Sequence, residues 1–180
     1  METENDAKLQ SPRERAMSKK STKLTDPKVD ALIEALNHLL GNGCRLFRVA
    51  KCCSWNVTGK HSEAARRLFE GQAEEVWSAQ HELAQHIRRL GGEAVPDDSD
   101  GIAVVRPQEI NYLRESLRGL ASHLRTGHQN ALLSIEAAED VAAEVEDLDA
   151  SRTFRVRIEA HSRHLHELET LGDGSNSRLM

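Results

Sequence analysis

Apolar residues recur along this chain with the spacing of an α-helix rather than that of a β-strand. Four segments carry the pattern, and they cover residues 27–53, 62–90, 108–138 and 147–171. Asp26 and Pro27 form a start signal for the first segment, since aspartate caps a helix and proline fits its first turn. Gly91 and Gly92 form a stop signal after the second. We therefore predict four long helices.

The segment 93–107 interrupts this pattern with two prolines, Gly101 and three aspartates. It is long for a loop between neighbouring antiparallel helices, so we interpret it as a crossover between the second and third helices. We interpret the short apolar stretch 102–105 as a helical turn that packs against the body or another subunit. The third helix is expected to begin at Gln108, with Leu113 in its apolar spine. The predicted fold class is an all-α four-helix bundle with a long crossover.

Composition agrees with this fold and narrows the function. Charged residues make up 29% of the chain and aromatic residues only 3%, which favours helices over sheet. No apolar run approaches the ~18 residues of a membrane span, and residues 1–7 are unlike a signal peptide, so we expect a cytoplasmic protein with no membrane partner. Cys44, Cys52 and Cys53 lack disulfide-like spacing and are interpreted as reduced thiols.

The net charge of −5 hides a basic N-terminal segment. Residues 12–24 contain one acid, Glu14, and five basic residues: Arg13, Arg15, Lys19, Lys20 and Lys23. We predict a disordered basic tail over 1–26, a bundle over 27–171 and a flexible C-terminus over 172–180. A basic arm on an acidic body suits binding of a polyanion without sequence specificity, because neutralised phosphates release counterions. A merely solubilising terminus is the alternative.

Several short segments resemble the Dps family, the DNA-binding proteins of starved cells, within the ferritin-like superfamily. The resemblance covers residues 27–171, and the matching segments keep the family's spacing without gaps. They are Leu36-Asn37-His38-Leu39-Leu40, Trp55-Asn56-Val57-Thr58-Gly59, Leu68-Phe69-Glu70 and Leu90-Gly91-Gly92. The resemblance implies a ferritin-like fold and a homo-oligomeric shell of twelve subunits. It also implies a role in the stress response. Members of the family oxidise ferrous iron, store ferric mineral and often coat DNA through basic termini.

The family's iron ligands are mostly replaced in this chain. They fall just before the tryptophan and eleven, fifteen, twenty-six and thirty residues after it, and are normally histidine, histidine, an acid, aspartate and glutamate. The corresponding residues here are Ser54, Arg66, Glu70, His81 and Gln85. Only Glu70 keeps its expected chemistry, and Arg66, which offers only donors, lies one helical turn away and can pair with it. The usual ferroxidase centre is therefore predicted to be lost or altered.

A rewired metal centre is the alternative at this place. Glu70 and His81 from facing subunits would hold iron, zinc or copper with a further ligand, and spacing does not choose among these metals. His81 as an ordinary interface residue is the plainer interpretation. His61 and His86 lie on the same helix and are interpreted as solvated.

The last predicted helix carries a second histidine group. His161 and His164 are three residues apart and so share a face, whereas His166 points elsewhere. Two imidazoles on one face can hold a divalent metal, but Arg157 and Arg163 raise the local positive charge and disfavour one.

Acidic residues crowd the joint between the third and fourth predicted helices. The resemblance implies a pore through which iron enters the shell, and a solvated helix end is the plainer interpretation. The residues are Glu136, Glu139, Asp140, Glu144, Glu146, Asp147 and Asp149.

The sequence thus predicts a shell-forming, cytoplasmic, nucleoid-associated protein that binds and protects DNA through its basic tail. Enzymatic activity is not the expected role, because four of five ligand positions are changed. Two alternatives stay open. One is an iron-storing protein that oxidises ferrous iron at a rewired centre, and the other is a non-catalytic partner subunit of an active paralogue.

Overall fold

Four long helices form one bundle, as predicted. The computed structural model describes residues 26–59, 62–96 and 107–174, and it describes no side chains for 172–174. The helices are α2 (Pro27–Asn56), α3 (Ser62–Arg89), α4 (Leu117–Glu144) and α5 (Leu148–Gly174), with a short 3₁₀ turn η1 (Pro107–Glu109). Across these ranges, no helix combines the length and apolar character needed to cross a membrane. The predicted basic tail and the stretch 102–105 lie outside the described residues.

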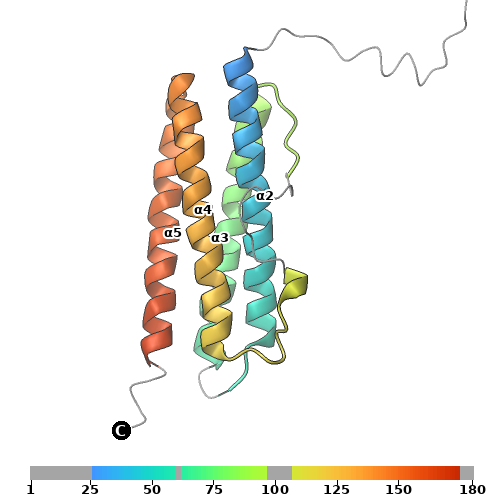
Figure 1. Ribbon diagram of the computed structural model, residues 1–180, viewed down its shortest axis with the longest axis vertical. Helices are drawn as coiled ribbons and strands as arrows, with labels where there is room; N and C mark the ends of the chain where they lie inside the picture. The colour runs from blue at the N-terminus through green and yellow to red at the C-terminus, as the bar shows by residue number, and fades with distance from the viewer. Residues whose placement is uncertain (1–25, 60–61, 97–106, 175–180) are drawn as a thin grey trace, which may run out of the picture.

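The order of the helices in space requires a long connection. Helix α2 runs antiparallel to α3, and α4 runs antiparallel to α5, whereas α3 and α4 point the same way (Figure 1). Helix α3 therefore ends at the opposite end of the bundle from the point where α4 begins. A helix of this length spans about 40 Å, so the connection must cover that distance. The predicted crossover between the second and third long helices is confirmed.

The local start and stop signals fix most helix ends as predicted. The Asp26 carboxylate accepts a hydrogen bond from the Lys28 amide at 3.0 Å and so caps α2. After α3, Gly91 adopts a φ of 91°, a left-handed conformation that glycine reaches without strain. Gly59, in the turn after Trp55, has a φ of 104° for the same reason.

The predicted start of the third long helix is wrong. Helix α4 begins at Leu117 rather than Gln108, because the Ser116 hydroxyl caps it by accepting from the Gly119 amide at 3.1 Å. The preceding residues form η1 and a turn instead of a further helical segment. Leu113, predicted to lie in the apolar spine, is 91% exposed. Apolar spacing continued by chance into a segment that precedes a strong capping residue.

The core fills the bundle in two apolar clusters, one toward each end. Phe69 and Leu124 lie in the first, and Leu36 and Phe154 in the second. Helices α2 and α3 approach closely at Gly43, where a Cβ would overlap the side chain of Gln80. Between the clusters, the buried face of α5 changes character. It presents Phe154 and Leu168 near its ends but polar side chains in its middle turns: Arg157, His161 and His164.

Candidate functional site

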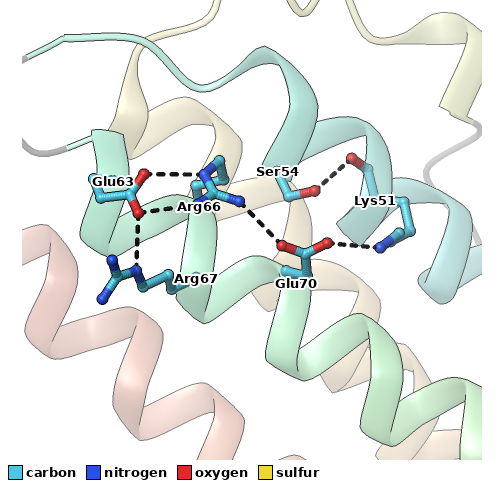
Figure 2. A network of polar contacts seen from close by, with 6 residues as sticks. All are labelled: Lys51, Ser54, Glu63, Arg66, Arg67 and Glu70. Atoms are coloured by element: carbon cyan, nitrogen blue, oxygen red, sulfur yellow. Dashed lines mark hydrogen bonds and ion pairs between the residues drawn. The ribbon is translucent and has the colours of Figure 1, made fainter.

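Glu70 is the residue that the sequence resemblance matches to an iron ligand, and two cations contact its carboxylate. Lys51 of α2 donates to Oε1 at 3.0 Å, and Arg66 of α3 donates to Oε2 at 3.2 Å. Figure 2 shows both cations turned toward the same carboxylate from two helices. The predicted pairing of Arg66 with Glu70 is confirmed, and Lys51 is an addition that the sequence did not indicate.

Arg66 is held in this position from its other side. Its Nε and Nη2 donate to the two oxygens of Glu63 at 3.1 and 2.9 Å. Arg67 also donates to Glu63. Hydrogen bonds from Arg66, and to a smaller degree from Arg67, lower the pKa of Glu63. The same Arg66–Glu63 hydrogen bond raises the pKa of Arg66. The guanidinium is thus a fixed positive charge beside Glu70.

The other predicted site residues near this position make separate contacts. Ser54 is buried, and its hydroxyl donates to the backbone carbonyl of Lys51 at 2.9 Å. Gln85 and His81 are exposed, and the His81 ring lies edge-on to Trp77 with centroids 5.6 Å apart. Glu70 and His81 are eleven residues apart on one helix, about 16 Å along its axis. One chain does not bring them together, so a joint site between facing subunits stays a prediction.

His86 corrects one prediction. It is buried rather than solvated, because the end of α3 packs beside the start of α5. Its Nε2 lies 2.7 Å from the Asp147 carboxylate, and its Nδ1 lies 2.9 Å from Arg89. Burial raises the pKa of Asp147, but hydrogen bonds from the Ala150 amide and from His86 outweigh it and lower that pKa overall. Asp147 is therefore a structural link.

The remaining acids of the joint between α4 and α5 are largely exposed, as either interpretation of them requires. The predicted DNA-binding residues Arg13, Arg15, Lys19, Lys20 and Lys23 lie outside the described residues, as does His61.

Three histidines meet inside the bundle, midway between its ends. His128 of α4 is fully buried, and His161 and His164 of α5 are 5% and 3% exposed. One ring nitrogen from each lies within 4.8 Å of the other two. The Nδ1 atoms of His128 and His161 are 2.8 Å apart. The predicted shared face of His161 and His164 is confirmed, and His166 is exposed as expected.

Helix α3 supplies an outer layer of polar groups to this cluster. The Gln72 carbonyl oxygen lies 3.3 Å from Nε2 of His128, and the Glu75 carboxylate lies 2.9 Å from Nε2 of His164. Gln72 is buried, and its amide nitrogen donates to the Glu167 carboxylate at 3.1 Å. Each of two histidines thus has an oxygen partner on α3.

Burial keeps the inner imidazoles neutral. It lowers the pKa of His128 far below the usual value, and the two neighbouring histidines lower it further. Burial, followed by the positive charge of Arg157, lowers the pKa of His161 to about 3. Neutral imidazole carries a lone pair on one ring nitrogen, and this is the form that binds metals. These two rings therefore offer nitrogen lone pairs suitable for a metal ion, and a ring nitrogen of His164 lies within reach of both.

Sequence reasoning missed His128 and Gln72. His128 follows Leu124 by four residues and precedes Ala131 by three, so it falls on the apolar stripe of its helix. Gln72 lies between Phe69 and Ala73 on the stripe of α3. Polar residues on an apolar stripe were the available signal. Their pairing across helices was not visible in the sequence.

Comparisons with known proteins agree with this architecture. The sequence profile of the ferritin-like domain family matches residues 33–174. The structure is similar to Dps from Thermosynechococcus elongatus, with 20% identity, a TM-score of 0.72, and coverage of 82% of this chain and 94% of that chain. It is also similar to a ferritin-like diiron-carboxylate protein from Bacillus anthracis, with 20% identity, a TM-score of 0.69, and coverage of 82% and 99%. At 20% identity, the similarity to these two structures shows the fold alone.

One curated relative is found by sequence. It is an uncharacterised protein of Kitasatospora aureofaciens, encoded in the bpoA2 5′ region. It is 26% identical over 110 residues, which cover 61% of this chain and 73% of the relative.

Proposed function

The chain belongs to the ferritin-like domain family, and we propose that it is a Dps-like, shell-forming member that binds and protects DNA through its basic tail. We propose further that it has lost the ferroxidase centre that the Dps resemblance implies. The observation that carries the second part is the Glu70 carboxylate, whose two oxygens are both taken by cations.

A ferrous ion at this position would have to displace two ammonium or guanidinium contacts. Lys51 and Arg66 place positive charge within 3.2 Å of the oxygens that the metal needs. Arg66 cannot lose its charge, and its hold on Glu63 keeps it from turning away. Iron favours carboxylate oxygen and neutral imidazole, and neither Ser54 nor Gln85 supplies a compensating charge. These contacts support a centre closed to iron.

Assembly into a shell is supported by apolar surface on α2 and α3. Trp55, in the last turn of α2, is 71% exposed, and Trp77 of α3 is 45% exposed. Large exposed aromatic side chains are typical of surfaces that a second protein covers. A shell would present many basic tails on one particle, and linked weak contacts to one DNA molecule raise the overall affinity.

A gel shift with duplex DNA tests the DNA-binding part. The full chain is compared with a chain lacking residues 1–24 and with a variant in which Arg13, Arg15, Lys19, Lys20 and Lys23 are all glutamine. We expect both variants to lose binding. If five phosphates are contacted per tail, affinity falls about 500-fold between 50 and 200 mM salt. Unchanged binding by either variant would contradict the proposal.

A ferrous oxidation assay tests the lost centre separately. Oxidation by peroxide or air is followed by absorbance, with and without the assembled protein. We expect the rate of the buffer alone. A faster rate that falls in Glu70→Ala and His81→Ala would instead establish the iron-oxidising alternative.

A further inference from the structure

The buried histidine cluster is a second place for a metal, unrelated to the family's position around Glu70. Glu70 bonds Lys51 and Arg66 near one end of α3, whereas His128, His161 and His164 lie within the bundle between α4 and α5. We propose that these three histidines bind one zinc-class divalent ion per subunit through their ring nitrogens. The inference stands apart from shell formation and DNA binding.

The outer partners determine which nitrogens are free. Gln72 presents its oxygen to Nε2 of His128, and this orientation is fixed because its amide nitrogen already donates to Glu167. Nε2 of His128 must therefore carry the proton. Because Glu75 accepts from Nε2 of His164, that nitrogen carries a proton as well. Neutral imidazole has one donor and one acceptor nitrogen, so the lone pair of each ring is on Nδ1.

The protein alone uses only one of these two lone pairs. Nδ1 of His128 can accept a hydrogen bond from Nδ1 of His161, 2.8 Å away. Nδ1 of His164 is buried and has no hydrogen-bond partner in the part of the chain that the structure describes. A buried acceptor without a partner is costly, and here it belongs to a side chain that is only 3% exposed. A bound cation would satisfy it.

The spacing suits a small ion after a modest adjustment. Zinc–nitrogen bonds of about 2.0–2.1 Å place tetrahedral ligand nitrogens about 3.3 Å apart. Here the Nδ1 atoms of His128 and His161 are 2.8 Å apart, and one ring nitrogen of each of the three histidines lies within 4.8 Å of the other two. On binding, His161 would move its proton from Nδ1 to Nε2, so that three lone pairs face the ion and no proton is released.

The donor set selects the class of metal. Three imidazoles and no carboxylate disfavour magnesium, calcium and manganese, which prefer oxygen. Among divalent ions that accept imidazole, zinc binds nitrogen sites more tightly than ferrous iron does. Hydrogen bonds from Gln72 and Glu75 to the outer ring nitrogens are the arrangement that orients histidine ligands in metal sites.

A groove between α3 and α5 gives access to the cluster. It has a volume of about 190 Å³, and its lining includes Glu75, Glu82, Arg157, His161 and His164. Arg163 is neutralised by its ion pair with Glu75, whereas buried Arg157 opposes a cation. Glu82, in the lining of the same groove, offsets the charge of Arg157. Because His161 and His164 line this groove, an ion has an entry path to the cluster.

Metal titration of the chelator-treated full chain tests the proposal. Cobalt(II) serves as a spectroscopic probe, since a tetrahedral site gives intense visible absorption, and zinc then displaces it. We expect one metal per chain and a zinc Kd of about 1 μM or tighter. Zinc should also raise the melting temperature. A chain that retains no cobalt or zinc would overturn the proposal.

Three variants locate the site. His161→Gln removes a ligand and should abolish the cobalt spectrum. Glu75→Ala removes an orienting partner whose side chain is 47% exposed, so folding should be preserved while zinc affinity falls about 10–100-fold. His166→Gln changes an exposed histidine of the same helix and should bind zinc as the parent chain does.

Glu70→Gln excludes binding at the family's position. It should leave the zinc Kd unchanged. Equal zinc binding by the parent chain and by both His161→Gln and Glu75→Ala, or zinc binding lost in Glu70→Gln, would contradict the assignment.

Discussion

Glu70 and Glu75 lie five residues apart on α3, and each contacts a neighbouring helix, yet they do opposite things. Glu70 bonds two cations, Lys51 and Arg66, and so its charge is used up within the chain. Glu75 divides its oxygens between Arg163 and the imidazole of His164. By accepting from the outer nitrogen of His164, it leaves the inner nitrogen free. On our two proposals, one carboxylate closes a metal position and the other orients a metal ligand.

The surroundings of the two carboxylates explain the difference. The Glu70 side chain is 35% exposed, so its charged partners remain partly hydrated and can persist as an ion pair. His164, the imidazole partner of Glu75, is buried. In the adjacent His161, burial and the charge of Arg157 favour the neutral imidazole. Around Glu70, the fixed charge of Arg66 stands where the proposal has a metal lost. Around Glu75, neutral imidazoles gather, and these are the groups that we propose bind a metal.

Truncation of the inner cluster should have the largest effect on folding. His128→Ala removes a fully buried ring and takes away the partner of the Gln72 carbonyl oxygen and of Nδ1 of His161. We expect a loss of about 2–4 kcal/mol in the free energy of unfolding, from the cavity and the orphaned polar groups. Urea denaturation with a chelator present, at fixed protein concentration, measures it.

His166→Ala is the matched control for this change, since the residue is exposed on α5. It should alter the free energy of unfolding by no more than about 0.5 kcal/mol. A loss below about 1 kcal/mol in His128→Ala would mean that the cluster contributes little to the core.

Introducing the ligands that the resemblance implies should create an iron-oxidising centre around Glu70. The variant combines Ser54→His, Arg66→His, His81→Asp and Gln85→Glu around the existing Glu70. We expect ferrous oxidation at least about tenfold faster than buffer, equivalent to 1.4 kcal/mol. A control variant with the three other changes but with Arg66 retained should oxidise ferrous iron at the buffer rate, because the guanidinium still bonds the Glu70 carboxylate. Equal rates in both variants would show that Arg66 is not the obstacle.

The two regions also differ in how far the sequence could predict them. The pairing of Arg66 with Glu70 followed from one helical turn, as did the shared face of His161 and His164. Lys51 and His128 come from other helices, and nothing local indicates them. Contacts within a helix follow from periodicity, whereas contacts between helices need the register in which those helices pack.

The same distinction applies to the fold. Asp26 and Gly91 determine helix ends through the chemistry of single residues, and both predictions were right. The start of α4 was wrong because apolar spacing before Ser116 outweighed one capping residue. Similarly, His86 was taken as solvated because its partner Asp147 is 61 residues away in the chain.

His86 and Asp147 form a histidine–carboxylate pair outside the three-histidine cluster. This pair therefore tests how much such a contact contributes to stability by itself. The folded structure lowers the pKa of Asp147, so its stabilisation is present above the unfolded value of about 3.9 and disappears as pH falls through the lower folded value. Asp147→Asn should cost about 1 kcal/mol at pH 7, and the difference should shrink below pH 4. Urea denaturation across pH measures it, and a difference that grows toward acid would contradict this sign.

The smallest effect on stability is expected from loss of the Arg66–Glu70 ion pair. Arg66 and Glu70 are partly exposed, so the attraction between them is screened by water and salt. Arg66→Ala should leave the free energy of unfolding almost unchanged, and the small difference should shrink further in high salt. A double-mutant cycle with Glu70→Gln, measured by urea denaturation, isolates the pair. A coupling above about 2 kcal/mol would mean that the pair is kept for folding. A small coupling instead supports the view that Arg66 matters for the metal it excludes, just as Glu75 matters for the imidazole it orients.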